Sequence, residues 1–345
     1  MLFAADSTRT YSMQKPLAAL LALLFVAFPA HAEQSRRPCL ADIRRVCPNV
    51  GLNSTAIRAC LAEHADQLSD ACRATIRERM QKRSDQNPLA TPDSTLRYGE
   101  DSLQTLDYYK GATDGARPLV IFIHGGGWAI GDKRSGTGAK AAFFTGHGYR
   151  YASINYRLVP KVDVATQAAD VAAAIARLRA DASALGIDPG RIALIGHSAG
   201  AHLAALVATD TRYLEKAGVP LGSVRAISLL DGAAYDVPRQ VAAQGDRASA
   251  LYVKAFGADS ATQQALSPIA YTSAPNAGAF ILHAVAQRPT ATTQAEALAS
   301  ALHDAGTPAE MHRVEGSNHR DINQNIGAAD DPVSQEILAF FERTL

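Results

Sequence analysis

Residues 191–208 read RIALIGHSAGAHLAALVA, and this stretch decides the fold class. The apolar segment Arg191–Gly196 predicts a buried strand, and the small residues of Ala199–Ala208 predict a helix. The turn between them, Gly196-His197-Ser198-Ala199-Gly200, matches G-x-S-x-G. In that motif a strand turns sharply into a helix, glycines occupy the crowded positions, and the serine hydroxyl stands above the sheet. Ser198 is therefore the candidate nucleophile.

Further apolar runs alternate with helical patterns on both sides of this stretch. Such alternation predicts an α/β fold, a mostly parallel sheet with helices on both faces and reactive groups at the carboxyl ends of its strands. Strands are expected at Leu119–His124, Tyr149–Ile154, Ser223–Leu230, Ala279–Val285 and Ala309–Val314, and helices at Val164–Ala180, Thr293–Ala305 and Pro332–Arg343.

A glycine cluster follows the first of these strands. It reads His124-Gly125-Gly126-Gly127-Trp128. Successive glycines leave backbone N–H groups free to bind an oxyanion, so Gly126 and Gly127, together with Ala199 after the nucleophile, are the expected oxyanion hole. The alternative, a phosphate-binding loop, is not favoured because neither glycine motif of such loops is present.

These motifs and several others resemble the hormone-sensitive-lipase-like and feruloyl-esterase-like branch of the α/β-hydrolases. The resemblance covers Tyr98 to Leu345. It implies an eight-stranded sheet, the chain order serine, acid, histidine, and hydrolysis of short-chain or aryl esters without a cofactor or metal. The segments that carry it are Tyr98-Gly99, Leu106-Asp107-Tyr108-Tyr109, His124–Trp128, Asn155-Tyr156-Arg157-Leu158, Asp188-Pro189-Gly190-Arg191-Ile192 and Gly196–Gly200.

The general base is read from its position. His319 follows the last expected strand through Glu315-Gly316-Ser317-Asn318 and precedes the last helix. Its loop resembles the histidine loop of the family. His319 would take the proton of Ser198 and return it to the leaving alcohol.

The acid is where this sequence departs from the family. Thr290 stands where the family carries its aspartate, in a segment expected to be a loop. Asp231 is the best substitute because it ends the strand before, although a turn or capping role for it stays open. Asp236 reads as a turn residue of the same loop and Glu296 as a residue on a helix surface.

The missing acid keeps other function classes open. A degenerate hydrolase acting as a binding module is one alternative, and an amidase resembling the kynurenine formamidases is another. The net charge of +1 gives no basic surface for nucleic acid, so a small-molecule ester is the expected partner.

The N-terminal segment has the layout of an export signal. A basic start at Lys15, the apolar run Leu17–Phe28 and small residues ending at Ala32 predict a signal peptide over residues 1–32, with Met13 as an alternative start. The mature protein would be secreted or periplasmic and would have no membrane contact. A retained N-terminal anchor is the alternative.

All four cysteines lie just after this signal, where an even number favours disulfides. The spacing puts each pair on one helix face, and an antiparallel hairpin would join Cys39 to Cys72 and Cys47 to Cys60. Residues 33–80 form the expected hairpin, which resembles the cysteine-rich repeat of Golgi cysteine-rich proteins. A linker is expected over residues 81–97 and the hydrolase domain over residues 98–345.

Overall fold

The computed structural model describes residues 39–48, 57, 60–61, 64, 67–76, 78, 90–243 and 246–345, with the side chains of 246–250 left aside. The expected signal peptide lies outside these residues. The chain divides into two units, Met1–Lys82 and Arg83–Leu345, which are considered separately. In the described part of the chain, no helix combines the length and the apolar character needed to cross a membrane.

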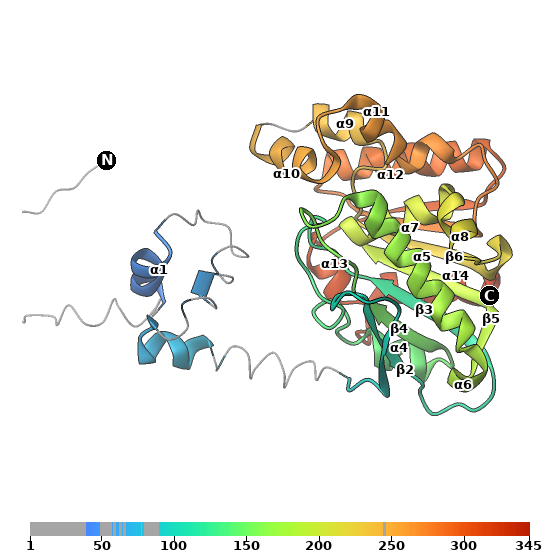
Figure 1. Ribbon diagram of the computed structural model, residues 1–345, viewed down its shortest axis with the longest axis horizontal. Coiled ribbons are helices and arrows are strands. Elements are labelled where there is room, and N and C mark those ends of the chain that lie inside the picture. Colours follow the sequence, from blue (N-terminus) through green and yellow to red (C-terminus); the bar gives the residue numbers. More distant parts are fainter. Residues whose placement is uncertain are drawn as a thin grey trace, which may run out of the picture. The chain divides into compact units, whose positions relative to one another are not determined.

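The larger unit is built on an eight-stranded sheet of order β1-β2-β4-β3-β5-β6-β7-β8 (Figure 1). In this order, each strand from β4 through β3 and β5 to β8 pairs in parallel with the next. β2 is antiparallel to both of its neighbours, β1 and β4. This is the mostly parallel sheet expected from the sequence. The strands are β1 Ser94–Arg97, β2 Thr105–Tyr109, β3 Arg117–Ile123, β4 Arg150–Ile154, β5 Ile187–His197, β6 Val224–Leu230, β7 Ala279–Val285 and β8 Ala309–Val314.

The first strand corrects the domain boundary expected from the sequence. The sequence predicts a linker that includes residues 94–97, yet these residues form β1 and pair with β2. The strand is half-exposed and only four residues long, so its sequence carries no apolar run. The expected boundary at residue 98 is therefore too late.

Helices cover both faces of the sheet because alternate side chains of each strand point to opposite sides. Leu119, Ile121 and Ile123 of β3 pack in one core with α5 and α7, which lie in front of the sheet in Figure 1. Val120 and Phe122 pack in a second core with α4 and α14. The helices are α4 Lys140–Gly146, α5 Val164–Ala180, α6 Ala182–Leu185, α7 Ala199–Thr209, α8 Arg212–Lys216, α9 Val237–Ala242, α10 Asp246–Phe256, α11 Ser260–Ala265, α12 Pro289–Asp304, α13 Asp321–Gln324 and α14 Pro332–Thr344.

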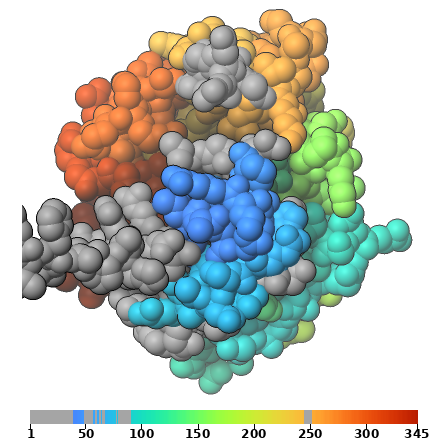
Figure 2. Space-filling model, turned by 90° about the vertical axis from the view of Figure 1, so that its left-hand side faces the viewer, coloured from blue at the N-terminus to red at the C-terminus, as the bar shows by residue number. Residues whose placement is uncertain are grey.

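Two disulfides hold the smaller unit, whose described residues are the blue atoms of Figure 2. Cys39 is bonded to Cys72 and Cys47 to Cys60, the pairs expected from the sequence. These bonds join α1 (Leu40–Val46) to the helical residues 70–76 and to residue 60. Closing loops of 33 and 13 residues stabilises such a small unit by limiting its unfolded chain.

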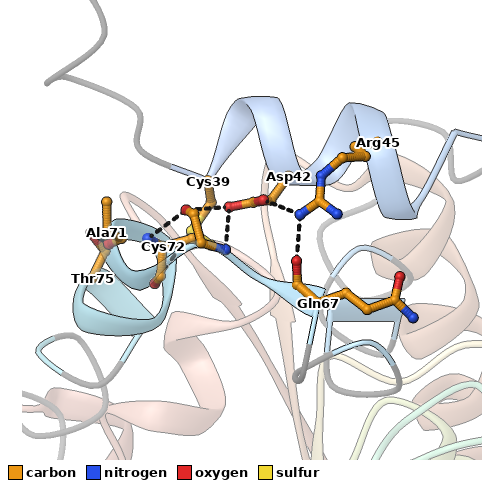
Figure 3. The surroundings of a disulfide bond; sticks show 8 residues. Cys39, Asp42, Arg45, Gln67, Ala71, Cys72 and Thr75 are labelled. Carbon is orange, nitrogen blue, oxygen red and sulfur yellow. Dashed lines mark hydrogen bonds and ion pairs between the residues drawn. A yellow bond between two sulfur atoms is a disulfide. The ribbon is translucent and has the colours of Figure 1, made fainter.

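A buried carboxylate adds polar contacts beside the first disulfide (Figure 3). Asp42 accepts hydrogen bonds from the Ser69 hydroxyl at 2.6 Å and from Arg45 at 2.7 Å. Arg45 also contacts the Gln67 carbonyl oxygen. Asp42 therefore ties α1 to the start of the second helical segment.

Candidate active site

Ser198 lies in a strained turn between β5 and α7. Its φ of 56° and ψ of −119° lie where residues with a side chain are rare. A Cβ atom on Gly196 would come within 2.3 Å of the Gly200 carbonyl oxygen, and one on Gly200 within 2.1 Å of the Ile123 oxygen. Both glycines of the motif are thus required by close backbone contacts, as the sequence predicts for this turn.

Three side chains from separate strand ends meet at this turn. The Nε2 atom of His319 lies 3.1 Å from the Ser198 Oγ atom, and its Nδ1 atom lies 2.5 Å from the Oδ2 atom of Asp231. Asp231 directly follows β6, and His319 lies between β8 and α13. The structure therefore brings the expected nucleophile, base and substitute acid into one line of hydrogen bonds.

Asp231 is fully buried and remains ionised. Burial by itself raises the pKa of this carboxyl group, but the His319 hydrogen bond and the Arg288 charge outweigh burial and hold the pKa below its usual value. The Val285 N–H also donates to its Oδ1 atom at 3.1 Å. A negative charge held next to Nδ1 of an imidazole keeps the proton there and leaves Nε2 free to accept one.

The other acidic candidates lie elsewhere. Asp236 caps α9, where it accepts a hydrogen bond from the Arg239 N–H. Glu296 pairs with Arg313. Thr290 lies in the first turn of α12, which begins at Pro289, so the loop expected around it is wrong. Proline at the first helical position favours an early helix start because its missing N–H costs nothing there.

Two neighbours of the site were not foreseen from the sequence. Arg288 contacts the Oδ2 atom of Asp231, and its Nη1 atom lies 2.6 Å from Nδ1 of His319. His197 donates from Nε2 to the main-chain oxygen of His319 at 2.7 Å. Burial, with the charge of His319, lowers the pKa of His197 to about 3. Both residues stand in segments that the sequence singles out, but only the fold reveals what they contact.

The glycine cluster packs against the nucleophile turn. A Cβ atom on Gly125 would lie 3.0 Å from the Cβ of Ser198. Gly126 and Gly127 have φ values of 130° and 57°. Within the described part of the chain, the N–H groups of Gly126, Gly127 and Ala199 donate no hydrogen bond. The N–H groups of the two glycines, in the cluster that packs on this turn, and the N–H of Ala199 at the start of α7 are available to an oxyanion.

Aromatic packing holds α10 beside this cluster. Trp128 is buried, packs against Phe256 with ring centres 4.7 Å apart, and donates from Nε1 to the His202 ring at 3.3 Å. Leu251 of α10 is 43% exposed, and its Cδ1 would lie 3.3 Å from a Cβ on Gly127. Apolar surface therefore borders the N–H groups expected to bind an oxyanion.

Comparisons with known proteins agree with this geometry. The model of the BD-FAE family matches residues 106–302. A probable isoprenylcysteine alpha-carbonyl methylesterase of Oryza sativa subsp. japonica is 28% identical over 244 residues, which are 65% of this chain and 56% of that protein. Esterase LipC of Mycobacterium tuberculosis is 34% identical over 140 residues, 39% of this chain and 34% of LipC. The chain thus spans about half the length, or less, of these two relatives.

The fold has solved counterparts. The crystal structure of esterase B from Lactobacillus rhamnosis superposes with a TM-score of 0.62 at 24% identity, and covers 79% of this chain and 92% of its own. The family model spans more than half of the 345 residues and includes the glycine cluster, Ser198 and Asp231. The chain belongs to the BD-FAE family and has the α/β-hydrolase fold.

Proposed function

We propose that this chain is a serine hydrolase that cleaves small carboxylic esters through an acyl-enzyme on Ser198. The observation that carries the proposal is the line of hydrogen bonds from Asp231 through His319 to Ser198. Esterases and methylesterases among its relatives support an ester as the substrate class. The apolar surface at Leu251 supports a small apolar acyl or alcohol group.

Each residue has one role in the proposed reaction. As the Ser198 oxygen attacks the ester carbonyl carbon, its proton passes to Nε2 of His319, and the ionised Asp231 stabilises the imidazolium. The N–H groups of Gly126, Gly127 and Ala199 hold the negative charge on the carbonyl oxygen. The imidazolium then gives its proton to the leaving alcohol. Water attacks the acyl-enzyme in the second half, with His319 again taking the proton, and a carboxylic acid is released.

An amide bond is the second candidate substrate. A kynurenine formamidase of Meyerozyma guilliermondii is 34% identical over 152 residues, 42% of this chain and 54% of that protein. The same residues would serve an amidase, since only the leaving group differs. Turnover of p-nitrophenyl acetate compared with a formanilide separates the two candidates.

The test of the proposal is labelling with a fluorophosphonate probe. Wild-type protein should be labelled and should hydrolyse p-nitrophenyl acetate, whereas Ser198→Ala should do neither. Wild-type protein that stays unlabelled and inactive would instead favour a binding module. Labelling that persists in Ser198→Ala would remove Ser198 as the nucleophile.

We also propose that the protein acts outside the cytoplasm. The layout of residues 13–32 supports export, and the two disulfides of the smaller unit fit an oxidising compartment. The smaller unit is then a stapled helical module of the cysteine-rich-repeat type. N-terminal sequencing of protein from the native cell should find Glu33 first, in the periplasm or the medium. Recovery of the intact N-terminus from the cytoplasm would contradict export.

A further inference from the structure

Two histidines and a glutamate meet on the face of the sheet that α14 covers, away from Ser198. His283 of β7 and His312 of β8 are direct partners in the parallel register. Their side chains share a face with Ile281 and Val314, whose neighbours include residues of α14. Glu336 reaches them from α14 itself. Three elements therefore each supply one side chain to the same place.

The donor atoms have the spacing of metal ligands. The Oε2 atom of Glu336 lies 2.8 Å from Nε2 of His283 and 3.5 Å from Nδ1 of His312. One donor atom from each residue lies within 4.8 Å of the other two. Zinc bonds of about 2.0–2.2 Å in tetrahedral geometry place ligand atoms about 3.3 Å apart. The separations of 2.8 Å and 3.5 Å from the Glu336 oxygen lie just below and just above that value.

The surroundings of His312 add a second observation. Its other ring nitrogen, Nε2, lies 3.7 Å from a carboxylate oxygen of Glu310. Glu310 is itself held by Arg343 at 2.8 Å. A histidine that binds metal through one nitrogen usually presents the other to a carboxylate, which fixes the ring and raises its basicity. His312 has this arrangement when its Nδ1 atom faces the cluster.

One contact between Glu336 and a single histidine accounts for only part of the cluster. The fully buried His283 side chain donates from Nε2 to Glu336 at 2.8 Å. The His312 ring also stacks on the His283 ring at 5.2 Å and turns its Nδ1 to the same carboxylate, so that one donor atom from each of three residues comes to one place. The side chains of His312 and Glu336 are 37% and 43% exposed, so an ion has a path to the site.

We propose that His283, His312 and Glu336 form a three-ligand site for zinc, with water as the fourth ligand. The ion would join β7, β8 and α14. The carbonyl oxygen of His283 also accepts the N–H of Asp231 at 2.7 Å, so the strand fixed by the ion is the one that supports the triad acid. The role is structural and does not depend on the proposed esterase activity.

The expected affinity is moderate. Among the described residues, the Nδ1 atom of His283 has no hydrogen-bond partner. Loss of such a partner typically weakens metal binding by about 10–100-fold. We therefore expect dissociation constants well above those of four-ligand structural zinc sites.

The experiment is calorimetric titration of the chelator-treated full-length protein with Zn²⁺. Wild type should bind one equivalent, and thermal unfolding should shift upward in saturating Zn²⁺. His312→Ala and Glu336→Gln, chosen because both side chains are partly exposed, should each weaken binding at least tenfold and lose the thermal shift. His303→Ala, an exposed histidine on α12, is the matched control and should bind as wild type does.

Three outcomes would overturn the proposal. These are no saturable binding by wild type, unchanged binding in both cluster variants, or an equal loss in the His303 control. Circular dichroism of each variant separates lost ligands from lost folding. Should His312→Ala unfold, Glu336→Gln decides alone, because it keeps the size and shape of the side chain and removes only the charge.

Discussion

The imidazole of His197 and the main-chain carbonyl of His319 are joined by a 2.7 Å hydrogen bond. His197 stands next to the nucleophile, so this bond ties the loop of the base directly to the turn of Ser198. Because burial, together with the nearby charge of His319, lowers its pKa to about 3, His197 stays neutral near pH 7 and keeps the proton that it donates. The motif residue between glycine and serine thus positions the base.

Replacing His197 should lower kcat with little change in KM. His197→Ala frees the His319 loop, and a displacement of about 1 Å costs on the order of 10²-fold in rate. Steady-state kinetics with p-nitrophenyl acetate measure the effect. His147→Ala, an exposed histidine on the C-terminal side of α4, is the control. Equal kcat values for both variants would show that the hydrogen bond from His197 does not position His319.

Asp231→Asn tests the acid. The amide cannot hold the imidazole proton on Nδ1, and such a change in a serine protease costs about 10⁴-fold in kcat. Asp236→Asn is matched in chemistry and lies in the same loop, but Asp236 only caps α9. It should leave kcat near wild type. A wild-type rate in Asp231→Asn would withdraw Asp231 from the site.

Arg288→Gln should raise kcat. The guanidinium lies 2.6 Å from Nδ1 of His319, and two N–H donors cannot hydrogen-bond to each other. Its charge opposes the imidazolium that forms during the reaction, while Asp231 keeps the Val285 N–H and His319 as donors. Since like charges at this distance repel by a few kcal/mol before solvent screening, we expect a gain of roughly three- to tenfold.

Arg288→Lys provides the control for that prediction because it keeps the cation. Its rate should stay close to wild type in the same assay. A fall in kcat for Arg288→Gln, with Arg288→Lys unaffected, would mean that the cation is needed to hold Asp231 in place.

Lys140 should make the larger unit more stable at alkaline pH. It is fully buried, its Nζ atom donates to the carbonyl oxygens of Gly136 and Asn323, and burial lowers its pKa from 10.5 to about 7. Between these two values the unfolded chain binds a proton that the folded chain does not. The free energy of unfolding therefore rises with pH, by roughly 1 kcal/mol per pH unit.

Urea unfolding at pH 7 and pH 9 measures this slope. The fluorescence of Trp128, the one tryptophan in the sequence, reports on the larger unit. Lys140→Met keeps the apolar stem and removes the amine, so its stability should not depend on pH in this window. A variant with the same slope as wild type would assign the pH dependence to another group.

Strongly patterned elements were predictable from the sequence. The expected bounds of α5, β7 and β8 coincide with the structure, because long helical periodicity and short apolar runs are local signals. The sequence patterns predict neither β1 nor β2. β1 alternates between half-exposed and exposed residues, and both strands owe their form to antiparallel pairing with neighbours. The residues of such short strands therefore give little local signal from which a strand could be predicted.

The residues of the site also differ in whether a local sequence pattern can predict them. Ser198 is recognisable from the sequence because the five consecutive residues 196–200 contain the whole G-x-S-x-G motif. Which carboxylate reaches His319 depends on the register that brings the end of β6 beside the loop after β8, and no local pattern encodes that contact. The contact of Arg288 with Asp231 spans 57 residues and arises only from the folded sheet.

The place of Asp231 also bears on how this fold can diverge. The N–H of Ser198 donates to the oxygen of Leu230, the residue just before Asp231. The nucleophile and the acid therefore follow two adjacent strands, β5 and β6. The segment between β7 and α12 therefore does not supply the acid of this site. Substitutions should therefore be accepted at Gln287, the exposed residue of this segment, whereas Arg288 next to it still contacts Asp231 and His319.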